Sequence, residues 1–274
     1  MAVLKDIPGL GTQWSFKFFT EVDTLSLRRS LEECIREFER LYSRFKSSSL
    51  LSKLNREQRL LNPPEDLVRM CRLGQEYYAL SGGLFNIATE THQRAQGYDA
   101  EYSFRERADL VPKTFDLSRS LRVSLDEITL EAGVTLDLGG LGKGYLIDKL
   151  SRYLQQERGL PYFVINGGGD IYVTSDHEQS VDLYLRHPLD STKALRKVAL
   201  CNQSLCASSP YVRRWGENTH LLDPFQPKRQ ITQSSFVIAS SATEADILAT
   251  VATLVTPEEF ARLTRHLAVE YLII

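Results

Sequence analysis

A glycine-rich segment next to a lysine has the residue types that bind a phosphate group. Asp137 comes just before the run Gly139-Gly140-Leu141-Gly142-Lys143-Gly144, and a helical pattern of apolar residues follows. Glycines ahead of a helix let the backbone approach a ligand, and the free N–H groups at the helix start attract phosphate. Lys143 would add a cation there. The spacing fits neither a Walker A loop nor a dinucleotide motif, so a tight strand-to-helix turn is the alternative interpretation.

A second glycine-rich segment, Asn166-Gly167-Gly168-Gly169-Asp170, follows the apolar run Phe163-Val164-Ile165. The apolar run is typical of a buried strand. Three consecutive glycines after it indicate backbone that lies close to a ligand, and a hairpin loop is the alternative.

A possible acid–base pair occurs in His220-Leu221-Leu222-Asp223-Pro224. Histidine is the commonest general base, and Asp223 could orient the imidazole. The alternative is a histidine with a structural or purely solvated role.

A possible metal site lies in Thr243-Glu244-Ala245-Asp246-Ile247-Leu248-Ala249-Thr250. On a helix, Asp246 and Thr250 are four residues apart, so both side chains project from one face. A carboxylate and a hydroxyl are hard-oxygen ligands that suit Mg²⁺ beside substrate phosphates. The alternative is an acidic residue near a helix start that interacts with the helix dipole.

The elements that must hold these motifs are predicted from apolar periodicity. Helices are expected at 27–45, 62–81, 146–154, 244–254 and from Thr256 onward, with a break at 47–55. Strands are expected at 14–20, 134–137, 163–165, 181–185, 197–201, 235–239 and 269–274, with hairpin strands within 99–132. This pattern predicts an α+β fold of mixed sheets with packed helices. We expect residues 1–274 to form a single unit, with two lobes that meet near the glycine-rich segments.

Composition narrows the functional classes. The 274 residues carry a formal net charge of -2, so nucleic acid is not an expected partner. The four cysteines form no CxxC pair, which is typical of a reducing compartment. No apolar segment approaches the ~20 residues that a membrane helix needs, and the first residues do not read as a signal peptide. We therefore expect a cytoplasmic protein without a transmembrane segment; an exported protein whose leader has been removed is the alternative.

Taken together and in order, the four segments resemble the ApbE-like FAD:protein FMN transferase family. That family carries a DLGGxxKG segment, an NxGGD segment, an HxxDP segment and an ADxxxT helix at similar spacing. Further matches are Gly11-Thr12, the stretch from Ser43-Arg44-Phe45 to Leu54-Asn55, and Gly83-Leu84-Phe85-Asn86. The resemblance covers nearly the whole chain, and the combination is specific although each segment alone is not.

The resemblance implies a fold, an activity and a set of site residues. The fold would be ApbE-like (T-fold-related), with an active-site cleft between two lobes. The activity would be magnesium-dependent cleavage of FAD, with FMN attached through a phosphoester to a Thr or Ser of an acceptor protein and AMP released. The base would be His220, and Mg²⁺ would be held by the backbone at Gly140 with Asp246 and Thr250. The FAD contacts would be Leu10, Phe45, Gln96, Gly97, Tyr98, Asp137, Lys143, Asn166, Gly168, Gly169, Asp170, His220 and Leu222. Two alternative functions are an FAD pyrophosphatase that yields FMN and AMP, and a non-catalytic flavin-binding protein.

The sequence also departs from the family pattern near the expected flavin pocket. Phe45 stands where the family usually has Tyr, and Gln96 stands where it usually has Trp. Each change removes a contact that a flavin or adenine ring could use. These departures predict weak FAD binding and predict that Gln96→Trp tightens it.

Overall fold

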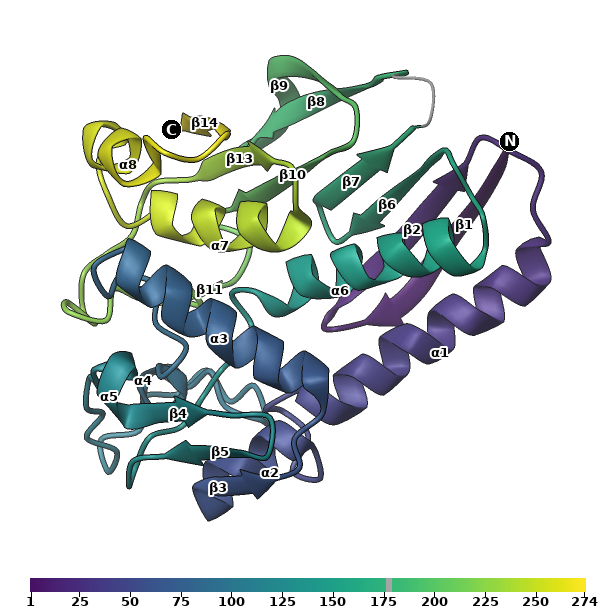
Figure 1. Ribbon diagram of the computed structural model, residues 1–274. Coiled ribbons are helices and arrows are strands. Elements are labelled where there is room, and N and C mark those ends of the chain that lie inside the picture. Colours follow the sequence, from purple (N-terminus) through teal and green to yellow (C-terminus); the bar gives the residue numbers. More distant parts are fainter. Residues whose placement is uncertain (176–178) are drawn as a thin grey trace.

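The largest element is a seven-stranded antiparallel sheet in the order β1-β2-β6-β7-β10-β13-β14 (Figure 1). A computed structural model describes residues 1–175 and 179–274 of the chain. The strands are β1 (Ala2–Gly9), β2 (Thr12–Phe18), β6 (Phe163–Gly167), β7 (Asp170–Thr174), β10 (Gln203–Ser208), β13 (Ser235–Ala239) and β14 (Glu270–Ile273). Leu10 and Gly11 join β1 to β2 with φ of 52° and 68°, the backbone that a two-residue hairpin turn requires.

Each face of this sheet is covered by different elements. The helices α1 (Thr24–Tyr42), α6 (Gly142–Arg152), which continues as η1 (Tyr153–Glu157), and α7 (Ala242–Ala252) lie across one face. A hairpin of β8 (Val181–His187) and β9 (Asp190–Leu200) covers the other face, and α8 (Pro257–Thr264) precedes β14. Side chains alternate accordingly along β6, where Phe163 and Ile165 face the helices and Val164 faces the hairpin.

A smaller lobe lies below the sheet in Figure 1. It holds a three-stranded antiparallel sheet in the order β3-β5-β4. Its elements are α2 (Leu50–Glu57), β3 (Arg59–Leu61), α3 (Glu65–Leu80), α4 (Glu90–Ala95), α5 (Leu117–Ser120), β4 (Leu121–Val123) and β5 (Glu127–Leu130). A short hairpin of β11 (Arg214–Trp215) and β12 (Asn218–Thr219) lies between β10 and β13 along the chain. The predicted α+β class with several sheets and packed helices is confirmed.

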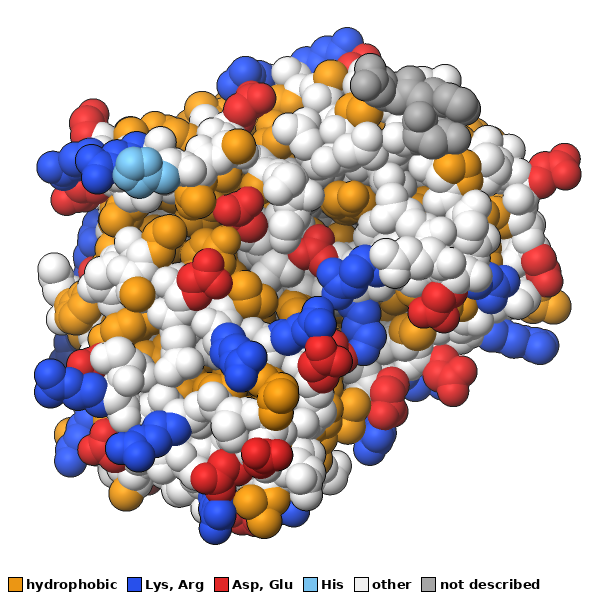
Figure 2. Space-filling view, viewed as in Figure 1, with side chains coloured by type: hydrophobic (Ala, Val, Ile, Leu, Met, Phe, Trp, Pro, Cys, Tyr) orange, Lys and Arg blue, Asp and Glu red, His pale blue; other side chains and the backbone are white. Residues whose placement is uncertain are grey.

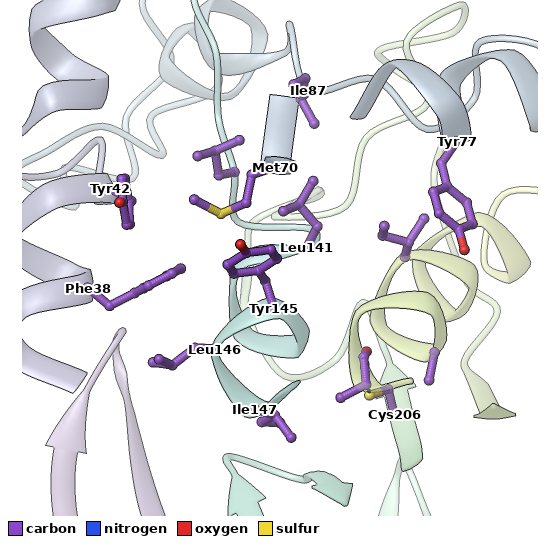
Figure 3. Close-up of a cluster of buried hydrophobic side chains, with 14 of the residues drawn as sticks. Phe38, Tyr42, Met70, Tyr77, Ile87, Leu141, Tyr145, Leu146, Ile147 and Cys206 are labelled. Atoms are coloured by element: carbon purple, nitrogen blue, oxygen red, sulfur yellow. Dashed lines mark hydrogen bonds between the residues drawn. The ribbon is translucent and has the colours of Figure 1, made fainter. Parts of the chain in front are cut away.

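One cluster of buried side chains joins the two lobes. Figure 3 shows Phe38 and Tyr42 of α1 and Tyr145 of α6 pointing toward Met70 of α3. Tyr77 of α3 points toward α7, where its hydroxyl lies 3.3 Å from Glu244 Oε1. These contacts hold α1, α6 and α7 in fixed positions around the space between the lobes.

Local details differ from the sequence predictions in three places. Residues 134–137 form no strand, because the backbone of Leu136 bonds to the side chain of Asn55 instead of a neighbouring strand (2.9 and 2.8 Å). The break predicted at 47–55 contains α2, which starts where the Ser49 hydroxyl accepts from the Ser52 N–H. Helix α3 begins at Glu65 after Pro64, and Asn62, which the helix predicted at 62–81 includes, lies outside it with φ of 48° directly after β3.

On the face shown in Figure 2, basic and acidic side chains are interspersed. None of the helices within residues 1–175 and 179–274 is long and apolar enough to cross a membrane.

Candidate active site

A cavity of about 760 Å³ lies between the two lobes. Its wall is built from the β1–β2 turn, the end of α1, the start of α6, the β6–β7 turn, the end of β10 and one face of α7. The wall includes these residues predicted from sequence: Leu10, Phe45, Tyr98, Asp137, Gly140, Lys143, Gly168, Asp170, His220, Leu222, Asp246 and Thr250. Most of the predicted site therefore meets in one place.

The crossing of α6 and α7 brings Lys143 and Asp246 together. The Asp148 carboxylate of α6 accepts from the N–H groups of Ala242 (2.8 Å) and Thr243 (2.9 Å), which caps the start of α7. The helices also touch directly, because a Cβ on Gly144 would lie only 2.3 Å from the Ala242 carbonyl oxygen. A side chain at residue 144 would therefore separate the two helices and the site residues that they carry.

A buried charge cluster forms at this crossing. The Lys143 ammonium pairs with the Asp170 carboxylate and lies 3.4 Å from Asp246 Oδ1, while Asp246 Oδ2 accepts from the Gly144 N–H at 3.0 Å. Burial raises the pKa of Asp246, and the nearby charge of Asp170 raises it further, although Lys143 opposes both effects. Burial would lower the pKa of Lys143, but the two carboxylates outweigh burial and raise it. With both carboxylates ionised the cluster would have a formal charge of -1, and the raised pKa of Asp246 reflects the cost of holding that charge in a buried site.

The oxygen atoms around Asp246 suit a small hard cation. Thr250 lies one helical turn further along α7, and its Oγ1 is 3.5 Å from the Ser208 hydroxyl. A Cβ on Gly140 would lie 4.0 Å from the same Thr250 oxygen, so the backbone of Gly140 borders this point. Carboxylate, hydroxyl and carbonyl oxygens in one place fit Mg²⁺. Among the described residues, no group of three His, Cys, Asp or Glu side chains forms a more conventional metal site.

Arg44 fixes the position of Asp137. Its guanidinium donates to Asp137 Oδ2 (2.9 Å), to Gln93 Oε1 (3.0 Å) and to the Tyr98 carbonyl oxygen (2.9 Å). The second oxygen of Asp137 accepts from the Gly139 N–H at 2.8 Å. The Asp137 carboxylate is therefore a partner in a buried ion pair that shapes the glycine-rich segment.

The β11–β12 hairpin carries His220 to the cavity. His220 Nδ1 lies 3.4 Å from the Arg213 carbonyl oxygen, and the His220 N–H donates to the same oxygen. Burial, aided by the positive charge of Arg213, lowers the pKa of His220 to about 4. The imidazole is therefore neutral at physiological pH, the state in which it can accept a proton.

The turn between β6 and β7 requires glycine at one position. Gly168 has φ of 73°, and a Cβ there would lie 2.2 Å from Thr12 Oγ1. The Asn166 side chain accepts from the Gly169 N–H at 2.8 Å, which shapes the same turn. The segment is thus a hairpin turn, as the alternative interpretation had it, and it also borders the cavity through Gly168 and Asp170.

Comparison with known proteins places this chain in a family. The family model described as "ApbE family" matches residues 10–273. The chain belongs to the ApbE family. Among its curated relatives, the FAD:protein FMN transferase of Klebsiella pneumoniae (strain 342) is 30% identical over 146 residues, which are 49% of this chain and 45% of that protein. The FAD:protein FMN transferase of Buchnera aphidicola subsp. Schizaphis graminum (strain Sg) is 25% identical over 257 residues. These residues are 86% of this chain and 75% of the Buchnera protein.

The fold agrees with this membership. The solved structure of the flavin transferase ApbE from Vibrio cholerae superimposes on this chain with a TM-score of 0.82. The match covers 100% of this chain and 93% of the Vibrio chain. At 18% sequence identity it shows that the two proteins share a fold. The family and the fold predicted from sequence are confirmed, and the predicted enzyme class agrees with the names of the relatives.

Among the residues that the structure describes, five of the predicted site residues do not line the cavity between the lobes: Gln96, Gly97, Asn166, Gly169 and Asp223. The predicted orienting role of Asp223 is wrong, because its carboxylate accepts from the N–H groups of Phe225 (2.9 Å) and Gln226 (3.1 Å) and pairs with Arg229 (3.2 Å). His220 is instead oriented by the Arg213 backbone.

The aromatic side of the cavity also differs from the prediction. The Gln96 side chain donates to the Pro227 carbonyl oxygen (2.8 Å), and neither residue lines the cavity formed by the described residues. Trp215 instead stacks on Tyr98, with ring centroids 5.5 Å apart and an interplanar angle of 22°. Phe45 stacks on Tyr102 at 5.0 Å and 12°. The prediction of weak FAD binding assumed that the Gln96 side chain faces the flavin ring, whereas that side chain is bonded to the Pro227 backbone.

Sequence reasoning gave no role to Arg44, Arg213, Ser208 or Tyr102, although all four line the cavity. Arg44 lies inside the Ser43-Arg44-Phe45 stretch that carries part of the resemblance, and this was the one available signal.

Proposed function

We propose that this chain is a magnesium-dependent FAD:protein FMN transferase that acts on a Thr or Ser hydroxyl of an acceptor protein. The observation that supports this most is the meeting of a neutral histidine with the buried Lys143–Asp170–Asp246 cluster on one cavity wall. This arrangement offers a proton acceptor and a cation site in a space of about 760 Å³, the size class of small-molecule pockets.

The reaction would be a phosphoryl transfer. The acceptor hydroxyl oxygen attacks the FMN phosphorus of FAD, the bond from that phosphorus to the bridging oxygen breaks, and AMP leaves with the bridging oxygen. The hydroxyl proton passes to His220, whose neutral imidazole is held by the Arg213 carbonyl oxygen. Because its pKa is lowered, His220 is a weak base, so it would act as the phosphorus–oxygen bond forms.

Asp246, Thr250 and the backbone of Gly140 would hold the magnesium ion, which supplies charge neutralisation at the phosphates. Lys143 would fix the position of Asp246 and Asp170. With Asp170 and Asp246 both ionised the cluster would have a formal charge of -1, and that charge would favour a divalent cation over a monovalent one.

The experiment incubates the protein with FAD and Mg²⁺, with and without an acceptor protein that offers a Thr or Ser. AMP together with a flavinylated acceptor, detected by chromatography and mass spectrometry, is the expected result. Free FMN and AMP in equal amounts, with or without the acceptor, would identify an FAD pyrophosphatase. FAD that remains intact while bound would identify a non-catalytic flavin-binding protein.

His220→Ala should lower the rate of AMP release by ~10²–10⁴-fold, the usual scale for loss of a general base. His266→Ala removes a histidine that is exposed at the end of α8 and is the matched control. AMP release by His220→Ala at the parent rate would exclude His220 as the base.

A further inference from the structure

Four basic side chains line the cavity, and they differ in the partners of their charges. Arg44 pairs with Asp137 (2.9 Å), Lys46 with Glu39 (3.1 Å), and Lys143 with Asp170 and Asp246. The fourth is Arg213. Its guanidinium donates to the Tyr98 hydroxyl at 2.6 Å and to the Gly11 carbonyl oxygen at 3.1 Å, which are both neutral groups. Within residues 1–175 and 179–274, Arg213 is thus the one basic side chain of this wall without a carboxylate partner.

The ion pairs of Lys143 make it a poor candidate for the main phosphate contact. Its single ammonium group is shared between two buried carboxylates, Asp170 and Asp246. A phosphate would have to compete with these carboxylates for the ammonium group. A guanidinium, in contrast, has five N–H donors, and the two described bonds of Arg213 leave donors for a further partner.

The position of Arg213 also relates it to the proposed base. Arg213 directly precedes β11 and His220 directly follows β12, so the two residues stand opposite each other at the base of one hairpin. His220 Nδ1 and N–H both face the Arg213 carbonyl oxygen. Trp215 anchors this hairpin to the end of α4, because its indole N–H donates to the Gln96 carbonyl oxygen at 2.7 Å.

We propose that the Arg213 guanidinium is the phosphate-binding cation of this cavity and takes the pyrophosphate of a flavin dinucleotide next to His220. This inference rests on the proposed function for the identity of the ligand. A planar guanidinium matches two phosphate oxygens at once, a geometry that a lysine does not offer. The hairpin would then deliver the phosphate contact and the proton acceptor as one unit.

The test compares FAD with riboflavin, which has the same isoalloxazine ring and no phosphate. Flavin fluorescence titrations of the whole chain, with EDTA present so that FAD is not consumed, measure both dissociation constants. Arg213→Gln retains an amide donor and removes the charge. It should weaken FAD binding by about 10- to 100-fold, the range for loss of a hydrogen bond to a charged group, and leave riboflavin binding within about twofold.

Three variants separate charge from structure. Arg214→Gln is the matched control, since Arg214 is the adjacent arginine, is exposed, and donates to the Gly216 carbonyl oxygen. Arg214→Gln should leave the dissociation constants of both FAD and riboflavin unchanged. Arg213→Lys should recover part of the FAD affinity. Tyr98→Phe removes the hydroxyl that Arg213 contacts but keeps the cation, so it should retain the preference for FAD over riboflavin.

The outcomes are distinct. Equal weakening of FAD and riboflavin by Arg213→Gln would show a purely structural role and overturn the inference. FAD affinity that is unchanged in Arg213→Gln would overturn it as well, while the proposed function would stand. A parent chain that binds neither flavin would overturn the proposed function and this inference together.

Discussion

Protonation of His220 should make the folded protein less stable in mild acid. The folded state holds the pKa of His220 at about 4, below its ordinary value of 6.5, because desolvation of the half-buried imidazole and the Arg213 cation both disfavour the protonated form. Between these two values the unfolded chain binds a proton that the folded chain does not. The free energy of unfolding is therefore highest above pH 6.5 and decreases as the pH falls toward 4.

The size of this effect follows from the two pKa values. Going from pH 8 to pH 5 should remove about 2 kcal/mol from the free energy of unfolding, and going to pH 4 about 3 kcal/mol. Other groups titrate in the same range; the raised pKa of Asp246, for example, acts in the opposite direction. Comparison of the parent with a variant that lacks the imidazole subtracts these contributions.

Urea unfolding of the parent and of His220→Asn at pH 8 and pH 5, without flavin, measures the difference. Asparagine retains a donor that can reach the Arg213 carbonyl oxygen. The parent should lose about 2 kcal/mol more than His220→Asn between the two pH values, and His266→Asn controls for the loss of an exposed imidazole. If the parent and His220→Asn lose the same free energy, the imidazole is not desolvated in the folded protein, and the low pKa that makes it a neutral base is refuted.

Four further substitutions test other parts of the site. Asp246→Asn should abolish magnesium binding by calorimetry and lower AMP release by at least ~10²-fold; magnesium affinity equal to that of the parent would remove Asp246 from the metal site. Gly144→Ala should cost about 2–3 kcal/mol in urea unfolding because its Cβ would meet the Ala242 carbonyl oxygen. In contrast, Gly142→Ala, with 3.9 Å to its nearest neighbour, should be neutral or gain up to ~1 kcal/mol; equal effects would contradict the close helix contact. Gln96→Trp should not tighten FAD binding in a fluorescence titration, and a tenfold gain would show that position 96 does reach the ring.

Patterns within one element were enough to predict much of the fold. The apolar positions from Leu27 to Phe45 repeat at helical spacing, and α1 spans Thr24–Tyr42. The run Phe163–Ile165 lies in β6, and the Thr256 cap starts α8 with a capping box to Glu259. Each of these signals depends on neighbours within a few residues, so the sequence itself contains them. The order of four short motifs along the chain was likewise sufficient to identify the family.

The partners of the charged groups could not be predicted from patterns within single elements. Lys143 pairs with Asp170 and Asp246, which lie 27 and 103 residues away, and Arg44 pairs with Asp137 across 93 residues. Asp223 is only three residues from His220, yet its carboxylate is taken up by its own turn and by Arg229. Coulombic and hydrogen-bond energies depend on distance in space and on burial, and both are set by how α6, α7 and the hairpins pack. The sequence by itself determined the elements and the chemical groups of this protein; only the tertiary structure decided that Lys143 pairs with two carboxylates, while the described partners of the Arg213 guanidinium are the neutral Tyr98 hydroxyl and Gly11 carbonyl oxygen.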